Sequence, residues 1–122
     1  MAGGLNRDGQ FGGNSSASAP LSFGFDTAVA FATDANVTAS AAQYSKPILK
    51  CTGAGPSVTR DLILPLTDPG AVWIVWNTIT GQSVRVIGAS GTGVTIATAR
   101  VAMVTTDGTN FLRLNAASVV TW

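Results

Sequence analysis

The chain has 122 residues, enough for one domain with one hydrophobic core. Hydrophobic residues make up 46% of it and charged residues 11%, and the charges nearly cancel at a formal +1. The seven Lys and Arg residues are scattered rather than gathered in a run, which argues against nucleic acid as the main partner.

So low a charge leaves much apolar surface for another protein to cover, and we expect a homo-oligomer, a trimer or a dimer. No stretch approaches the ~18 apolar residues that span a bilayer, and the first residues lack the pattern of a secretory signal. We therefore expect synthesis in the cytoplasm and no membrane partner. Cys51 is the only cysteine, so no internal disulfide is possible, and we expect it to be a small buried hydrophobe.

Residues 1–20 consist mostly of Gly, Ser, Asn and Ala, a composition that cannot fold alone. We interpret them as an extended N-terminal arm and residues 21–122 as the folded domain. Isolated large apolar residues can fill pockets on a partner, and Arg7 can pair with an acid there. The predicted partner-binding residues are Leu5, Asn6, Arg7 and Phe11. The alternative is an arm that is fixed by its own domain.

From Leu21 onward, short runs rich in Val, Ile, Thr and aromatic residues alternate with Gly, Pro, Asn and Asp. The Ala-rich stretch 27–35 is compatible with a turn or two of helix, capped by Asp26. The spacing of the strands predicts an all-β fold: a single antiparallel β-sandwich or small barrel, jelly-roll-like, behind the extended arm. The predicted strands are Val37–Ala41, Pro47–Thr52, Ser57–Leu64, Ala71–Asn77, Ser83–Ile87, Gly93–Ala97, Arg100–Thr105, Asn110–Leu114 and Ser118–Trp122.

The connections carry their own signals. Asn77–Gly81 is predicted to be a five-residue hairpin loop, and Asp107-Gly108 a second hairpin turn. Asp68-Pro69-Gly70 is predicted to reverse the chain before the next strand. Gly88–Gly93 lacks the Lys-Ser/Thr ending of a phosphate-binding loop, so a turn between strands is favoured.

In Val72–Trp76 both alternating sets of side chains are apolar, so each face of this strand should be covered. One face belongs to the core, and the other faces either a second sheet or the axis of an oligomer. Arg85 and Arg113 each lie between apolar neighbours, which predicts half-exposed strands with the Arg facing solvent or a partner.

The chain contains no His and no Glu, which excludes a Ser-His-Asp or Cys-His site, and zinc lacks ligands. All six acids are Asp and most lie in predicted turns, so we expect no enzyme activity, no metal site and no cofactor. A glycosidase with two Asp carboxylates stays as a remote alternative.

The segment 71–114, AVWIVWNTITGQSVRVIGASGTGVTIATARVAMVTTDGTNFLRL, resembles a module of tailed-bacteriophage virion proteins and tail-fibre segments. The shared order is an apolar strand ending in Asn, a Thr/Gly loop, a Val-rich strand, a Gly-rich turn before VTI, another apolar strand and Asp-Gly-Thr-Asn before a last strand. VTRDLILPL just upstream also fits. One departure is Ala97-Thr98-Ala99, which stands where a Gly-containing turn is common. The first 40 residues carry no resemblance.

The resemblance implies a virion structural protein. The short chain favours a capsid decoration protein on the capsid surface, bound to the major capsid protein through the arm and the β domain. The competing hypothesis is a tail-fibre or receptor-binding adaptor that recognises a host surface glycan, with Tyr44 and the tryptophans as stacking platforms. Trp73, Trp76 and Trp122 are the predicted oligomer contacts. For Trp73 and Trp76 the alternative is the core of the domain, and for Trp122 it is an exposed chain end.

Overall fold

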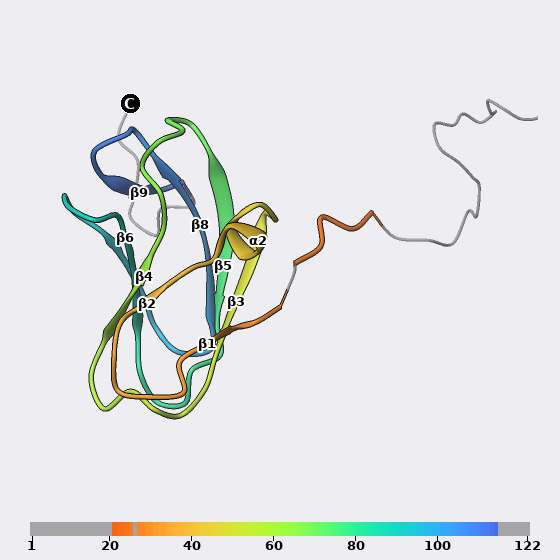
Figure 1. Ribbon diagram of the computed structural model, residues 1–122. Coiled ribbons are helices and arrows are strands. Elements are labelled where there is room, and N and C mark those ends of the chain that lie inside the picture. The colour runs from red at the N-terminus through yellow and green to blue at the C-terminus, as the bar shows by residue number, and fades with distance from the viewer. Residues whose placement is uncertain (1–20, 26, 115–122) are drawn as a thin grey trace, which may run out of the picture.

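The computed structural model describes residues 21–25 and 27–114, and their fold is a sandwich of two β-sheets (Figure 1). One sheet has the strand order β1-β3-β5-β8-β9, and the other has the order β2-β4-β6-β7. The predicted all-β class and its two packed layers are confirmed. The elements are β1 (Val29–Ala30), β2 (Val37–Thr38), α2 (Ala41–Tyr44), β3 (Ile48–Thr52), β4 (Arg60–Ile63), β5 (Val72–Asn77), β6 (Val84–Ile87), β7 (Val94–Ile96), β8 (Arg100–Thr106) and β9 (Phe111–Arg113).

From β1 to β6 the chain alternates between the two sheets, so that each strand lies parallel to the strand two places earlier. These six strands therefore form three successive coils. Antiparallel pairing begins only with β6–β7, β5–β8 and β8–β9. The sandwich was expected to be antiparallel, and this is wrong for the four pairs β1–β3, β2–β4, β3–β5 and β4–β6, which are parallel. The apolar alternation of a strand is the same in either direction, so the pattern could not reveal the parallel coils.

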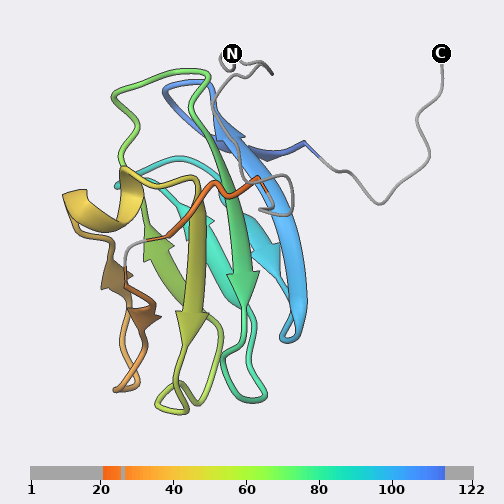
Figure 2. The ribbon, with the colours of Figure 1, turned by 90° about the vertical axis from the view of Figure 1, so that its right-hand side faces the viewer.

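The core lies between the sheets and is built from rows of side chains on paired strands. In the five-stranded sheet one buried row runs Val29, Cys51, Asn77 and a second runs Leu49, Val75, Ala102. The four-stranded sheet faces them with buried side chains at Leu62, Val84, Val86, Val94 and Ile96. Figure 2 shows the five-stranded sheet face on, with β3, β5 and β8 side by side.

Two predictions near the N-terminal end of the domain are wrong. The stretch 27–35 contains β1 instead of a helix, because pairing with Cys51 and Thr52 and burial of Val29 and Phe31 outweigh the helical propensity of alanine. The predicted strand 37–41 ends at Thr38, and α2 follows. Ser40 caps this helix in a capping box, a signal that the sequence prediction missed.

The predicted strands between residues 47 and 114 all contain observed strands, whereas Ser118–Trp122 lies outside the described residues. The loop after Asn77 has the expected positive φ at Gly81, but it is no hairpin. It carries the chain from β5 in one sheet to β6 in the other. The turn at Asp107-Gly108 does join a hairpin, β8–β9, and residues 88–93 join the hairpin β6–β7.

The Asp68-Pro69-Gly70 prediction is also confirmed. The carbonyl of Asp68 accepts a hydrogen bond from Ala71 N–H at 3.0 Å, and Gly70 has φ +91°. Proline at the second position and a positive-φ glycine at the third are the marks of a type II turn. This turn delivers the chain into β5.

Candidate functional site

The outer side of the five-stranded sheet is apolar. We call it the outer apolar face and define it by six side chains on β5, β8 and β9: Val72, Ile74, Trp76, Val101, Met103 and Leu112. Cross-strand register places Trp76 beside Val101 and Ile74 beside Met103. Five of the six are exposed and Ile74 is half-buried. Exposed apolar patches of this kind are rare on monomeric proteins and usually mark sites of protein contact.

The outer side of the four-stranded sheet is different. Its central row is Asp61, Arg85 and Thr95 on β4, β6 and β7. Arg85 binds Asp61 through two parallel bonds, Nε to Oδ1 at 2.7 Å and Nη2 to Oδ2 at 3.0 Å. This ion pair raises the pKa of the guanidinium, chiefly through the hydrogen bond to Asp61. One outer face is thus charged and polar, and the other is apolar.

The prediction for strand 72–76 is met on one side only. Trp73 and Val75 point into the core, whereas Val72 and Trp76 are exposed. Arg85 faces solvent as expected. Arg113 is half-buried and donates from Nη2 to the carbonyl of Thr95 at 2.7 Å, so its side chain joins the two sheets and its expected outward orientation is wrong.

The three tryptophans that were predicted as oligomer contacts differ in their placement. Trp73 is 5% exposed; its ring lies 6.1 Å from that of Phe111, and its Nε1 donates to the carbonyl of Tyr44 at 2.8 Å. This placement assigns Trp73 to the core of its own domain rather than to an oligomer contact. Trp76 is 39% exposed, and the ammonium of Lys50 lies 4.6 Å from its ring centre. Trp122 lies outside the described residues.

A cleft of about 390 Å³ lies between α2 and the turn that precedes β5. Tyr44 and Trp73 contribute aromatic surface to its lining, and Lys46 and Asp68 contribute opposite charges. A second hollow, about 510 Å³, shares Tyr44, Pro65 and Thr67 with the first and is lined mainly by apolar side chains. A partly exposed ring beside charged and hydroxyl groups is a chemistry that can hold a sugar. Most glycosidases use two carboxylates, and the lining of the 390 Å³ cleft contains one.

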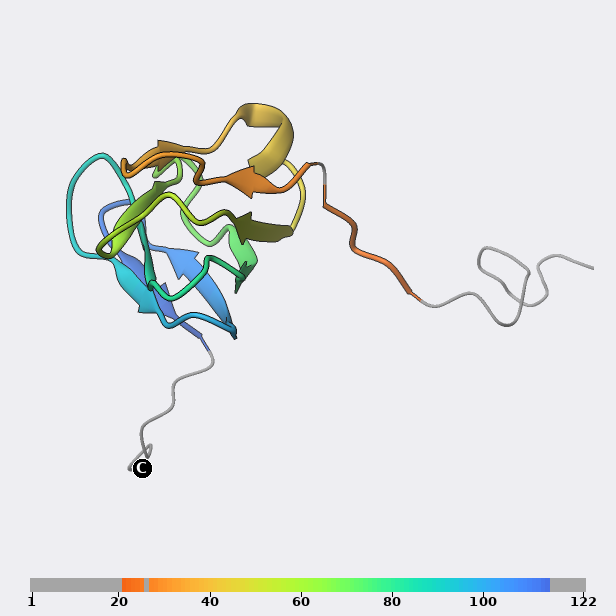
Figure 3. The same cartoon turned by 90° about the horizontal axis from the view of Figure 1, so that it is seen from below.

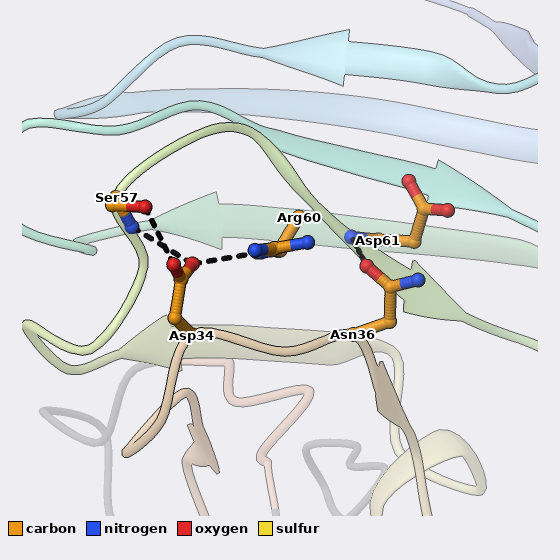
Figure 4. A network of polar contacts seen from close by, with 5 residues as sticks. All are labelled: Asp34, Asn36, Ser57, Arg60 and Asp61. Atoms are coloured by element: carbon orange, nitrogen blue, oxygen red, sulfur yellow. Dashed lines mark hydrogen bonds and ion pairs between the residues drawn. The ribbon is translucent and has the colours of Figure 1, made fainter.

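Figure 4 shows a polar network that joins two loops on the four-stranded side. The carboxylate of Asp34 accepts from Arg60 Nε at 2.8 Å and from the backbone N–H and hydroxyl of Ser57. Asn36 Oδ1 accepts from Asp61 N–H at 2.9 Å. The hydrogen bonds from Arg60 and Ser57 hold the pKa of Asp34 well below its usual range. Each member is paired within the network, so its role is to fix the path of the chain around β2 and β4.

Two further expectations about polar groups are confirmed. Asp107 Oδ1 accepts from the backbone N–H groups of Asn110 and Thr109, and these bonds lower the pKa of the carboxyl. This is the turn role predicted for Asp. Cys51 is buried, and burial raises the pKa of its thiol to about 12. The thiol therefore stays protonated and unreactive in the folded protein.

The predicted partner-binding residues Leu5, Asn6, Arg7 and Phe11 lie outside the described residues. Within residues 21–25 and 27–114, no group of three or more candidate ligands is placed to hold a metal ion. No helix in this part of the chain is long and apolar enough to cross a membrane. Comparison of the chain with protein-family models, with curated proteins and with solved structures finds no match.

Proposed function

We propose that this chain is a non-enzymatic structural subunit of a bacteriophage particle, a capsid decoration protein that binds the assembled shell. The observation that carries its assembly role is the contrast between the two outer faces, one with the Asp61–Arg85 ion pair and one with the outer apolar face. Covering an apolar sheet face with another protein lowers the free energy of the complex, because apolar surface is removed from water. The phage assignment rests on the sequence resemblance of residues 71–114.

The mechanism is linkage. A protein that binds the assembled shell and not its separated subunits stabilises the shell by its binding free energy at each site. Several copies held together bind more tightly than one, since the second contact is intramolecular once the first has formed. In this proposal the arm residues Leu5, Asn6, Arg7 and Phe11 contact the major capsid protein.

The test adds the full chain to shells of the phage that encodes it, prepared without this protein, and measures co-sedimentation and the melting temperature of the shell. We expect saturable binding and a higher shell melting temperature. The double variant Leu5→Ser/Phe11→Ser should bind at least about tenfold more weakly, because isolated apolar anchors carry much of such binding energy. The matched control is Ser15→Ala/Ser16→Ala, within the same arm. Absence of the wild-type chain from the shell pellet contradicts the proposal.

The second candidate function is a tail-fibre or receptor-binding adaptor that binds a host surface glycan. The specific observation in its favour is the cleft where Tyr44 lies together with Lys46 and Asp68. Titration calorimetry with purified surface polysaccharide tests it. Binding that is lost in Lys46→Ala or Asp68→Asn and kept in the remote control Thr95→Ala favours the adaptor over the decoration protein.

A further inference from the structure

Nine of the ten large apolar side chains that the described part of the chain exposes lie on strands of the five-stranded sheet or next to them in the chain. Five belong to the outer apolar face, Leu114 follows directly after β9, and three more lie just before β1. Only Val58 lies elsewhere, in the loop before β4. This distribution sets two apolar features apart, the outer apolar face and the segment 21–25.

The segment 21–25 has the alternation of a strand but pairs with no strand in the described fold. Leu21, Phe23 and Phe25 are 85%, 55% and 45% exposed. Figures 1 and 3 show that the segment leaves the sandwich beside β1 and runs outward on the side of the five-stranded sheet, away from its own domain. The segment and its three exposed apolar residues therefore lie on the same side of the molecule as the five-stranded sheet.

The outer apolar face selects an apolar occupant. Its rows run across neighbouring strands, Lys50–Trp76–Val101 and Ile48–Ile74–Met103. Lys50 brings the single charged group into these rows, and its ammonium lies over the Trp76 ring. A charged peptide or a phosphate would find one cation there, whereas a short run of alternating Leu and Phe would find a matching surface.

We propose that a second copy of this chain covers the outer apolar face with its segment Leu21–Phe25, in a reciprocal exchange. Each copy carries one face and one segment on the same side, so two copies related by a two-fold axis satisfy both contacts and the association closes. The exchange deepens the proposed function by naming the partner of the face, and it leaves residues 1–20 of both copies for the shell. A dimer presents two such arms, which raises their effective concentration at a lattice.

The experiment measures the molar mass of the full chain by sedimentation equilibrium over a range of concentrations. We expect twice the 12.4 kDa chain mass for the wild type. Val101→Lys places a charge on the face, and Phe23→Ser removes the central side chain of the segment. Each should weaken self-association at least about tenfold, the effect of losing one buried anchor. The control is Val58→Lys, because Val58 and Val101 are 52% and 51% exposed; it should associate as the wild type does.

Mixing the two variants tests the exchange itself. A mixed dimer unites the intact face of Phe23→Ser with the intact segment of Val101→Lys, so one complete contact is restored. The mixture should therefore dimerise more strongly than either variant alone. A monomeric wild type, or a mixture no better than its components, overturns the proposal. Thermal unfolding of each variant establishes that the domain is folded. Shell binding is measured separately, so its failure would remove the phage role and leave the exchange standing.

Discussion

The side-chain amide of Asn77 donates to the carbonyl of Ile96 at 2.9 Å, across the interior of the sandwich. The same Nδ2 donates to the carbonyl of Gln82 at 3.0 Å, and Oδ1 accepts from Ile79 N–H at 2.9 Å. Asn77 is fully buried at the end of β5. It satisfies backbone groups of the arch, the loop 78–83 between β5 and β6, and of strand β7. One side chain therefore ties the two sheets together.

Replacing Asn77 with alanine should lower the free energy of unfolding by about 3 kcal/mol, because the change leaves buried backbone groups without hydrogen bonds. Urea unfolding at neutral pH measures the loss. Thr80→Ala, in the exposed part of the same arch, is the control and should change the stability by less than about 0.5 kcal/mol. An equally small loss for Asn77→Ala would show that water replaces the amide.

Ala99 has φ +62°, the one positive value among the described non-glycine residues. Its N–H donates to the carbonyl of Asn77 at 2.8 Å, which holds the connection from β7 to β8 in this conformation. In this conformation a residue with a Cβ is less stable than glycine by about 1 kcal/mol. Ala99→Gly should therefore stabilise the protein by about that amount, while Ala97→Gly, without a positive φ, should be neutral or destabilising. A lower melting temperature for Ala99→Gly would contradict this reasoning.

The Asp34 network predicts a pH dependence of stability. Hydrogen bonds lower the pKa of Asp34 in the folded protein, so the unfolded chain takes up the proton first as the pH falls. The stabilisation is complete above about pH 5 and is lost as the pH falls below about 4 toward the folded-state value. Asp34→Asn should melt below the wild type at pH 6, and the difference should shrink toward pH 2. A difference that is constant between pH 6 and pH 2 would place the effect elsewhere.

The sequence predicted most of the strands because their apolar alternation and their turn residues are local features. It did not predict β1, since two residues in an alanine-rich stretch form a strand only by pairing with Cys51 and Thr52. The parallel coils were missed for the same reason, because the residues of one strand do not determine which strand it pairs with. The Asn that ends the first apolar strand of the quoted pattern is the buried Asn77.

The candidate site was predicted in part. The double-sided apolar pattern of Val72–Trp76 indicated apolar side chains on both faces of the strand, and Trp76 lies on the outer one, which is exposed. The cleft at Tyr44 could not be predicted, because its lining comes from α2 and from a turn more than 20 residues later. The residue pattern within one element does not predict which distant segment it contacts in the fold.

Gly91 and Gly70 offer a matched pair for the last prediction, since both have positive φ, +87° and +91°. A Cβ at Gly70 would meet nothing within 4 Å, whereas a Cβ at Gly91 would lie 2.1 Å from the carbonyl oxygen of Thr109. The Gly-rich turn here rests on the Asp107–Asn110 turn, where Asn110 Oδ1 accepts from Thr92 N–H at 2.8 Å.

Gly70→Ala should therefore lower the free energy of unfolding by about 1 kcal/mol, because alanine is unfavourable in the left-handed conformation. Gly91→Ala adds a backbone clash that separates the two turns, and it should cost about 3 kcal/mol or more, in the range of other steric defects in well-packed regions. Urea unfolding of both variants under one condition gives the comparison. Equal losses would mean that the two turns move apart freely and that their contact contributes little to the stability of the sandwich.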